Sequence, residues 1–472
     1  MMYGVVDIGT TGIKLCVYNG DLRRVYYEKV GLGFKRVGGR FLEQDSETIY
    51  RVVRGFARKA KGLGARLLGL AVYRASVVAW RRDGKPLTNV VTWVDRRGVR
   101  VVRRLPLYVR ILRRLPVLGA VIRPESPAML LKWFFDHVEG LRDMVRRGEA
   151  MAWTLDSYLA YRLSGRYVSD ATNTAMTGLV HPKGLKPLRV VASLLGIPFR
   201  PPKAVDNVYE YGEVEGLDFR VVIGDQQASA VAEGCLSRGR VKATHGTGTF
   251  ITAASGGFRM AGGGLVPVVI VKLGGRVVYG VEGFIYTTGS VVDWLLKIGL
   301  FKSYLEMEEA AARGRPGVFF LPSFSGLKTP PALDLRGVIS GLTLNTTRED
   351  LIRGLAETVA LYTAYILEEM GDAVGGLREP LRCDGGYSQS DVFLQLLADY
   401  TGLRVERPVD IEGTARGVAA LLAVGDGRLS LDEVEGTVEV GRVFEPSIPE
   451  SRRIEALEGF KEKLKRIVGL TS

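Results

Sequence analysis

A carboxylate and a glycine- and threonine-rich turn lie close together near the middle of this chain. An apolar run, Phe219–Ile223, ends in Gly224-Asp225-Gln226-Gln227, and His245-Gly246-Thr247-Gly248-Thr249-Phe250 follows shortly afterwards. Glycine and threonine allow backbone N–H groups and hydroxyls to approach phosphate oxygens. A carboxylate beside such a turn can accept the proton of an attacking hydroxyl. The pair predicts phosphoryl transfer to an alcohol with Asp225 as base, although a helix N-cap aspartate has the same local sequence.

Two further turns carry the same kind of residues. Asp7-Ile8-Gly9-Thr10-Thr11, followed by Lys14, combines an acid, a glycine and two hydroxyls, which suit Mg²⁺ and phosphate oxygens. Asp384-Gly385-Gly386 is a strand-to-helix turn where a nucleotide could pass over bare backbone. Each turn alone could be an ordinary structural turn. Four such turns in one chain favour a nucleotide-dependent phosphotransferase.

Other chemistries find little support in the sequence. The three histidines fit neither a Ser–His–Asp arrangement nor an H-E-x-x-H helix, and no Walker A or G-x-G-x-x-G motif is present. The three cysteines are far apart and fit no disulfide or metal spacing. A reducing cytoplasm is therefore the expected location.

The candidate residues require an α/β scaffold that places turns at the ends of buried strands. Strands are predicted at 3–7, 13–18, 67–73, 77–81, 219–223, 240–244 and 250–254, with another entering 384. Helices are predicted at 46–61, 128–138, 154–163, 226–233, 348–370, 391–401, 413–424 and 454–468, the first capped at Ser46. The second half repeats the plan of the first, with a strand, an acidic turn and a helix.

Length and charge limit the class of protein. A chain of 472 residues suits two large domains, and we place them at 1–220 and 221–472. No membrane span or signal peptide is apparent. The net charge is +14, but the arginines are spread along the chain, and the densest cluster, Arg96 to Arg114, has the spacing of a solvated helix face. Nucleic acid and membranes are therefore not expected as partners.

The motifs resemble those of the FGGY family of carbohydrate kinases from end to end. The segments that carry the resemblance are Asp7–Thr11, Glu43-Gln44-Asp45, Trp93–Arg97, Asp170–Thr174, Gly224–Gln227, Gly246–Phe250, Pro322–Gly326, Asp334–Gly337, Gly341–Thr343, Glu357 and Asp384–Gly386. The resemblance implies two actin/hexokinase-like (ribonuclease H-like) α/β domains with an active-site cleft between them. It is strongest to the glycerol kinases of that family.

The resemblance also implies a role for each candidate residue. It makes Asp225 the catalytic base and assigns Mg²⁺ to Asp7 and Asp225. The substrate residues are Arg74, Trp93, Glu125, Asp225, Gln226 and Phe250. The ATP residues are Thr10, Thr11, Lys14, Thr247, Gly289, Asp293, Gly386 and Ser390. The implied partner is a small polyol or sugar; the sequence leaves the oligomeric state open, with a homodimer as one alternative.

Several positions depart from the glycerol kinase pattern. Ala75 follows Arg74 where an acid is usual, and Glu125 stands where a tyrosine would contact polyol hydroxyls. Asp293 and Ser390 replace a glutamine and an asparagine of the nucleotide side. Loss of an acceptor for a substrate hydroxyl removes roughly 1.5–3 kcal/mol. The substrate therefore stays open between glycerol or a close analogue and a pentulose such as xylulose, with a catalytically silent ATP-binding regulator as a third alternative.

Overall fold

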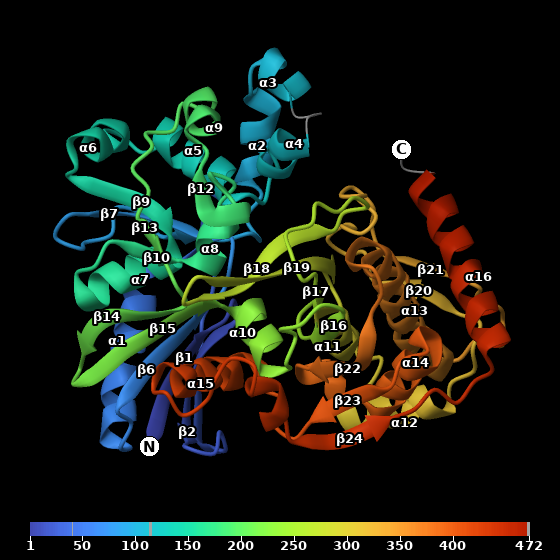
Figure 1. The fold of residues 1–472 in the computed structure, drawn as a ribbon. Coiled ribbons are helices and arrows are strands. Elements are labelled where there is room, and N and C mark those ends of the chain that lie inside the picture. Colours follow the sequence, from blue (N-terminus) through green and yellow to red (C-terminus); the bar gives the residue numbers. More distant parts are fainter. Residues whose placement is uncertain (40, 113–115, 470–472) are drawn as a thin grey trace. The chain divides into compact units, whose positions relative to one another are not determined.

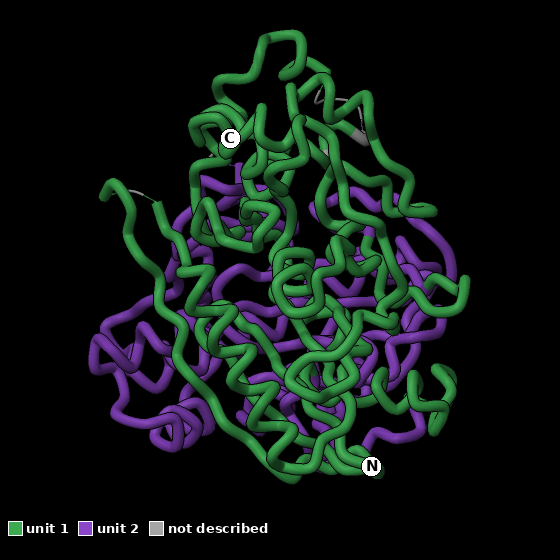
Figure 2. Tube along the Cα trace, turned by 90° about the vertical axis from the view of Figure 1, so that its left-hand side faces the viewer, with its two compact units in different colours: residues 1–228, 268–277, 414–434 green, residues 229–267, 278–413, 435–472 purple. Residues whose placement is uncertain are grey.

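The computed structural model describes residues 1–39, 41–112 and 116–469. It contains two compact units, which are coloured separately in Figure 2. The first unit comprises residues 1–228, 268–277 and 414–434, and the second comprises 229–267, 278–413 and 435–472. Both units contain strands and helices interspersed along the chain (Figure 1), as expected for an α/β fold.

The first unit is built on a six-stranded sheet in the order β14-β15-β6-β1-β2-β3. Its strands are β1 (Met2–Ile8), β2 (Gly12–Asn19), β3 (Arg24–Gly31), β6 (Leu67–Val72), β14 (Val208–Val214) and β15 (Leu217–Gly224). β1, β6 and β15 run parallel, while β2, β3 and β14 are antiparallel to their neighbours. The parallel strands β1 and β6 are almost wholly buried, which explains their continuous apolar sequences.

Two glycines show how helices cover both faces of this sheet. A Cβ at Gly4 of β1 would lie 2.8 Å from the Ala60 side chain of α1 (Ser46–Gly62). A Cβ at Gly69 of β6 would lie 2.4 Å from Val418 of α15 (Gly413–Gly425). Gly69 pairs with Val5, the residue after Gly4, and successive strand residues face opposite sides. The helices α1 and α15 therefore pack closely on opposite faces.

A smaller sheet in the order β4-β5-β8-β7-β9 completes the core of the first unit. Its strands are β4 (Lys35–Val37), β5 (Phe41–Gln44), β7 (Val77–Arg81), β8 (Val90–Val91) and β9 (Ala150–Thr154). The helices around it include α2 (Arg97–Arg104), α3 (Leu107–Leu112), α4 (Pro116–Val121), α5 (Pro127–His137), α6 (Leu141–Arg147), α7 (Leu155–Ser164), α8 (Ala171–Ala175) and α9 (Arg189–Leu194). Short pairs join β10 (Val168–Asp170) to β13 (Lys203–Val205) and β11 (Val180–His181) to β12 (Lys186–Pro187).

The second unit repeats the same sheet plan. Six of its strands follow the order β19-β17-β16-β22-β23-β24, with β16, β22 and β23 parallel. They are β16 (Arg240–His245), β17 (Thr249–Ala254), β19 (Arg276–Ile285), β22 (Arg378–Asp384), β23 (Val405–Pro408) and β24 (Val440–Phe444). In both units a hairpin precedes two parallel strands and an antiparallel edge strand.

Helices and a short strand pair complete the second unit around its own core. The helices are α11 (Gly289–Lys297), α12 (Tyr304–Arg313), α13 (Arg348–Val374), α14 (Asp391–Thr401) and α16 (Glu450–Gly469), and the pair is β20 (Phe319–Leu321) with β21 (Val338–Ser340). Two further elements, α10 (Asp225–Ala232) and β18 (Val266–Leu273), contain residues of both units, as β19 and α15 do. Phe460 and Leu464 of α16 are buried in the core of the second unit, so the C-terminal helix packs against it.

The structure corrects two expectations from the sequence. The side chain that caps α1 is that of Asp45, which accepts a hydrogen bond from the Thr48 amide, and Ser46 is the first helical residue. The arginine cluster is not a uniformly solvated face, because Arg97 is fully buried. Its members Arg113 and Arg114 lie outside the described residues.

The three cysteines are free and buried, in agreement with the absence of a disulfide spacing. Among the described helices, none combines the length and apolar character needed to cross a membrane.

Candidate active site

The carboxyl ends of three parallel strands bring candidate residues to one edge of the first unit's sheet. Asp7 of β1 is paired with Ala71 of β6, which is paired with Ile223 of β15. Arg74 and Asp225 follow the ends of their strands by one or two residues. Neighbouring strands are about 4.8 Å apart, so Asp7 and Asp225 stand roughly 10 Å apart at the level of the backbone. Ligands of open α/β sheets bind at this kind of edge.

Asp225 is in contact with Arg74. The Arg74 Nε lies 3.5 Å from Asp225 Oδ1, and the two side chains are 8 % and 23 % exposed. A Cβ at Gly224 would lie 3.1 Å from the aliphatic part of Arg74 and 2.5 Å from Gln227 Oε1. Glycine at 224 therefore lets Arg74 cross the end of β15. The Gln226 amide donates to Asp225 Oδ1 at 2.8 Å, and the Gln226 side chain is largely buried.

The hairpin between β1 and β2 forms the predicted first phosphate turn. The Gly9 amide donates to the Gly12 carbonyl at 2.9 Å and closes the tip, which carries Thr10 and Thr11. Asp7 is buried, and Lys14, its partner in the strand register, places Nζ 3.5 Å from Asp7 Oδ2. A buried carboxylate and a cation therefore lie immediately behind the tip.

Two residues that hold this turn were not recognised as site residues from the sequence. The Gln44 amide donates to the Thr10 carbonyl at 2.7 Å, and the Tyr73 hydroxyl donates to Gln44 Oε1 at 2.7 Å. Burial raises the pKa of the Tyr73 hydroxyl, so it stays a neutral donor. Gln44 belongs to the quoted Glu43-Gln44-Asp45 segment, which was the only sequence signal.

Trp93 and Glu125 lie in loops of the first unit. Trp93 is in a turn closed by a hydrogen bond from the Asp95 amide to the Thr92 carbonyl. Glu125 precedes α5 and has Arg123 as an ion-pair partner at 3.9 Å. The carbonyl of Pro124 would lie 1.9 Å from a Cβ at position 98, so Gly98 allows the Glu125 loop to approach α2.

A buried polar network lies behind Gly224. The Gly224 amide donates to Thr172 Oγ1 at 2.8 Å, and this hydroxyl donates to Asp170 Oδ1 at 2.5 Å. Asp170 also accepts from the Asn173 side chain at 2.7 Å and from Asn207 Nδ2 at 3.1 Å. The Asp170–Thr174 segment is one of the motifs that resemble the FGGY family. The sequence does not predict that it hydrogen-bonds to the end of β15, directly before Asp225.

In the second unit, the hairpin between β16 and β17 meets the N-terminus of α11. The Gly246 amide donates to the Gly248 carbonyl at 2.9 Å, which leaves Thr247 exposed at the tip. The Thr288 and Gly289 amides donate to the carbonyls of Thr247 and Gly246, at 2.9 and 3.0 Å. A Cβ at Gly289 would lie 2.4 Å from the Gly246 carbonyl. The structure therefore brings Thr247 and Gly289 together.

The Asp384–Gly386 turn lies beside the same hairpin. Asp384 pairs with Thr244 across parallel strands, and a Cβ at Gly385 would lie 2.7 Å from the His245 carbonyl. Gly385 has a φ of +90°, which favours glycine. Gly386 is exposed, with no heavy atom within 4 Å of the position a Cβ would take. This open backbone is where an adenosine could lie.

The remaining nucleotide and substrate candidates contact other side chains or backbone groups of the second unit. Ser390 caps α14 by accepting from the Phe393 amide at 3.1 Å, and Asp293 accepts from the Tyr304 hydroxyl at 2.6 Å. That hydrogen bond raises the pKa of Tyr304. Phe250 stacks at a tilt against Phe284, with ring centroids 5.6 Å apart. Neither Ser390 nor Asp293 needs a nucleotide to explain its present contact.

His245 has a structural role. Its ring is fully buried, and Nδ1 lies 2.9 Å from Thr249 Oγ1. Burial lowers the pKa of His245 to about 3, so the ring is neutral near pH 7. It supports the hairpin that carries Thr247.

The described residues contain no group of three or more His, Cys, Asp or Glu side chains suited to a metal ion. Mg²⁺ in phosphotransferases is bound by one or two carboxylates together with substrate phosphates and water. The single buried carboxylate of Asp7 beside the hairpin tip fits that mode of binding.

The FGGY family of carbohydrate kinases accounts for both halves of the chain. Its N-terminal domain model matches residues 2–216 and its C-terminal domain model matches residues 241–425. The chain belongs to the FGGY family of carbohydrate kinases. This confirms the predictions of the family and of an ATP-dependent carbohydrate or polyol kinase.

Individual relatives agree with the family. A glycerol kinase of Thermococcus gammatolerans is 34% identical over 489 residues, covering 98% of this chain and 97% of the relative. A crystal structure of Plasmodium falciparum glycerol kinase with ADP has a TM-score of 0.89 at 24% identity, covering 99% and 98% of the two chains. A ligand-bound xylulose kinase from Lactobacillus acidophilus has a TM-score of 0.84 at 18% identity, with the same coverage. The predicted two-domain α/β fold is thereby confirmed.

Replacing Thr172 by valine should destabilise the strand that carries Asp225. The change leaves the buried Gly224 amide without an acceptor and removes a donor to Asp170. An unsatisfied buried polar group costs about 1–3 kcal/mol, and we expect a loss of that size in urea unfolding. Thr172→Ser retains the hydroxyl and is the control. A Thr172→Val variant as stable as the unaltered protein, with a loss confined to Thr172→Ser, would show that the methyl group, not the hydrogen bond, matters.

Asp156 should make stability depend on pH. Its carboxylate is buried beside Asp170, and burial followed by that neighbouring charge raises the pKa of Asp156 to about 8. Between its unfolded value of about 3.9 and about 8, the folded state binds the extra proton, so the free energy of unfolding falls as pH rises. Urea unfolding at pH 5 and pH 8 should show a smaller decrease for Asp156→Asn than for the unaltered protein. An identical decrease would contradict the assignment.

Proposed function

We propose that this protein transfers the γ-phosphoryl group of ATP to a hydroxyl of a small polyol or sugar, glycerol or a close analogue first. The observation that carries the proposal is the common strand edge at which Asp7, Arg74 and Asp225 emerge, with Asp225 held against a guanidinium. The relatives named glycerol kinase support this substrate class. Under this proposal, region 1–220 contributes the substrate residues and first phosphate turn, and 221–472 contributes the base and nucleotide residues.

Asp225 acts as the general base. Its carboxylate accepts the proton of the substrate hydroxyl while the hydroxyl oxygen attacks the γ-phosphorus and the bond to the β–γ bridging oxygen breaks. Arg74, whose Nε lies 3.5 Å from Asp225 Oδ1, keeps the carboxylate oriented. Gln226 orients a substrate hydroxyl, and Trp93 and Phe250 supply apolar walls.

The two hairpin tips hold the phosphates. Thr10, Thr11 and Thr247 donate hydroxyl and backbone hydrogen bonds, and Lys14 adds a positive charge. Gly289 and Gly386 offer bare backbone to the adenosine, with Asp293 and Ser390 nearby in sequence. Mg²⁺ bound through Asp7 and Asp225 would neutralise charge on the ATP phosphates.

The reducing cytoplasm is the expected location, because all three thiols are free and buried. A homodimer stays a prediction.

Asp225→Asn should abolish most of the transfer. The amide keeps the shape of the carboxylate but cannot take the proton, and general-base catalysis contributes about 10²–10⁴-fold. We expect kcat to fall by that factor while ATP binding is retained, measured by coupled ADP release and by calorimetry. Asp218→Asn removes a carboxylate from the same strand, where Asp218 pairs with Arg220 at 2.6 Å, and should leave kcat unchanged. Full activity in Asp225→Asn would rule out its role as base.

A substrate panel should separate the three alternatives. With Mg-ATP, turnover of glycerol or another small polyol supports the first proposal, and preferred turnover of a ketopentose such as xylulose supports a pentulose kinase. ATP binding without turnover of any polyol or ketose supports a silent regulator.

The variant Ala75→Glu tests whether another residue of the substrate site replaces the acid that glycerol kinases have after the arginine. Ala75 adopts a φ of +53° directly after Arg74, so a carboxylate there would project from the same turn. If Glu125 already supplies the acceptor, the second acid should lower glycerol turnover, measured as kcat/KM. Increased turnover would instead mean that the present pocket was built for another substrate.

A further inference from the structure

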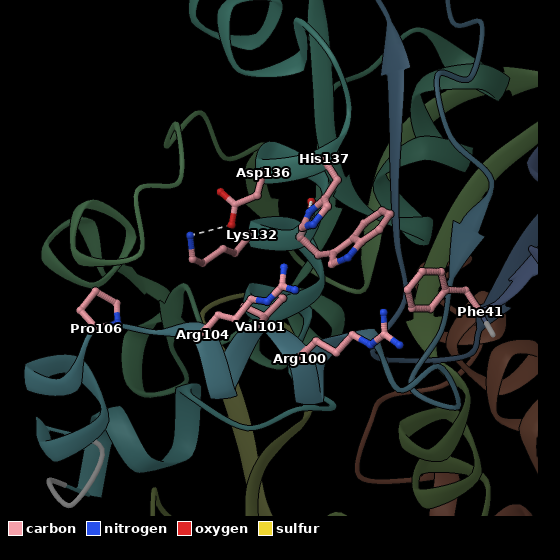
Figure 3. A pocket seen from close by; sticks show the side chains of 9 residues that line it. Phe41, Arg100, Val101, Arg104, Pro106, Lys132, Asp136 and His137 are labelled. Atoms are coloured by element: carbon pink, nitrogen blue, oxygen red, sulfur yellow. Dashed lines mark hydrogen bonds and ion pairs between the residues drawn. The ribbon is translucent and has the colours of Figure 1, made fainter. Parts of the chain in front are cut away.

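A cavity in the first unit lies between α2 and α5, and no residue of it belongs to the proposed active site. Its volume is about 220 Å³, and Figure 3 shows the side chains that line it. The lining residues are Phe41, Arg100, Val101, Arg104, Pro106, Lys132, Trp133, Asp136 and His137. Arg100 and Arg104 come from α2, and Lys132, Asp136 and His137 come from α5, which packs against it. Two helices thus present basic side chains to one cavity.

The positive charge of this cavity is not balanced by the protein. Lys132 Nζ is paired with Asp136 at 2.8 Å, and Asp136 also accepts from Arg142 at 3.2 Å. Within the part of the chain that the structure describes, neither Arg100 nor Arg104 has an ion-pair partner. Cations gathered in a cavity repel one another unless an anion joins them.

Another arginine of α2, Arg97, has a structural role and serves as a comparison. Arg97 is fully buried and binds Asp95 and Glu43, each at 2.8 Å. Its guanidinium has two carboxylate partners supplied by the fold. Arg100 and Arg104 are exposed at the cavity, and no carboxylate of the described residues pairs with them, which leaves both guanidinium groups accessible to an anionic ligand.

The faces of the aromatic rings at the cavity are covered by other side chains of the protein, which restricts the kinds of ligand that can bind there. Trp133 stacks on His137 with ring centroids 4.5 Å apart and also has the Arg97 guanidinium 4.4 Å from its ring. Phe41 has Arg97 at 4.6 Å and Arg100 at 5.4 Å. With these contacts in place, the rings offer edges rather than open faces, so a stacked nucleobase is disfavoured. The His137 Nδ1 donates to the Trp133 carbonyl at 2.9 Å, which leaves Nε2 for another partner.

The size of the cavity points in the same direction. Sites for drug-sized ligands occupy roughly 300–1,000 Å³, and 220 Å³ is below that range. A phosphate group with a short carbon skeleton suits a cavity of this volume better than a nucleotide does. Arginine side chains bind phosphate oxygens through paired N–H donors, which suits two of them on one wall.

We propose that the cavity between α2 and α5 binds the phosphate monoester of a small polar molecule, with Arg100 and Arg104 holding the phosphate. Lys132 and His137 line the α5 side of the cavity (Figure 3) and supply the remaining polar contacts to the ester. The edges of Phe41 and Trp133 bound its carbon skeleton.

The test is calorimetric titration of the full-length protein with glycerol 3-phosphate and, separately, with inorganic phosphate. The double variant Arg100→Gln/Arg104→Gln should lose at least tenfold in affinity at one site. Arg103→Gln removes one positive charge from α2 at an exposed position outside the cavity, as Arg104→Gln does within it, and should bind like the unaltered protein. Monoester bound near Asp225 contributes equally in all three proteins, so their difference isolates the cavity.

The outcomes are distinct. Equal affinities in all three proteins, or an equal loss in Arg103→Gln, would overturn the proposal. Inorganic phosphate that binds as tightly as glycerol 3-phosphate would overturn the monoester assignment. Arg104→Gln alone is the second variant, because Arg104 makes no ion pair among the described residues and its loss should not disturb folding, which far-UV circular dichroism checks. Binding is measured without turnover, so the result does not depend on which hydroxyl the kinase phosphorylates.

Discussion

The parallel register of β1, β6 and β15 is the constraint on which the candidate active site depends. Asp7, Arg74 and Asp225 are far apart in sequence and meet only because three buried strands end at one edge. Each strand rises about 3.3 Å per residue and alternates its side chains between faces. A slip by one residue in β15 would therefore turn Asp225 away and expose apolar side chains. The hydrophobic packing of the sheet and the position of Asp225 are thus fixed by the same contacts.

The same sheet plan in the second unit positions the nucleotide candidates. In each unit, a glycine amide closes the hairpin tip through a 2.9 Å hydrogen bond to a glycine carbonyl. The parallel strand beside each hairpin then delivers a second turn to the same edge, at Arg74 in one unit and at Asp384 in the other. One architecture used twice yields the proposed base and first phosphate turn in the first unit and the proposed second phosphate turn and adenosine turn in the second.

Much of this organisation could be predicted from the sequence. The buried strands are continuous apolar runs in the sequence. The turns of the candidate site are recognisable because their glycine, hydroxyl and acidic residues lie within a few positions of one another. Contacts between distant segments could not be predicted this way. The bonds from Gln44 to Thr10 and from Thr172 to Gly224 join residues whose sequence distance says nothing about their proximity.

The sequence also could not show which charged side chains are buried. Arg97 has the same helical spacing as its exposed neighbours, and only the positions of Asp95 and Glu43 make its burial tolerable. The cap of α1 likewise lies one residue before the predicted one, because Asp45 and Ser46 are both good capping residues and the backbone decides between them. Periodicity identifies a helix, but not which of its polar residues the fold encloses.

The way the first unit is assembled from the chain has a consequence for its biosynthesis. The helix α15, whose Val418 packs against Gly69 of β6, is encoded after most of the second unit. At the ribosomal rate of about 5–20 residues per second, the intervening stretch of roughly 190 residues takes about 10–40 s to emerge. During that interval one face of the first sheet lacks its helix. The nascent chain therefore exposes an apolar surface to chaperones well before synthesis is complete.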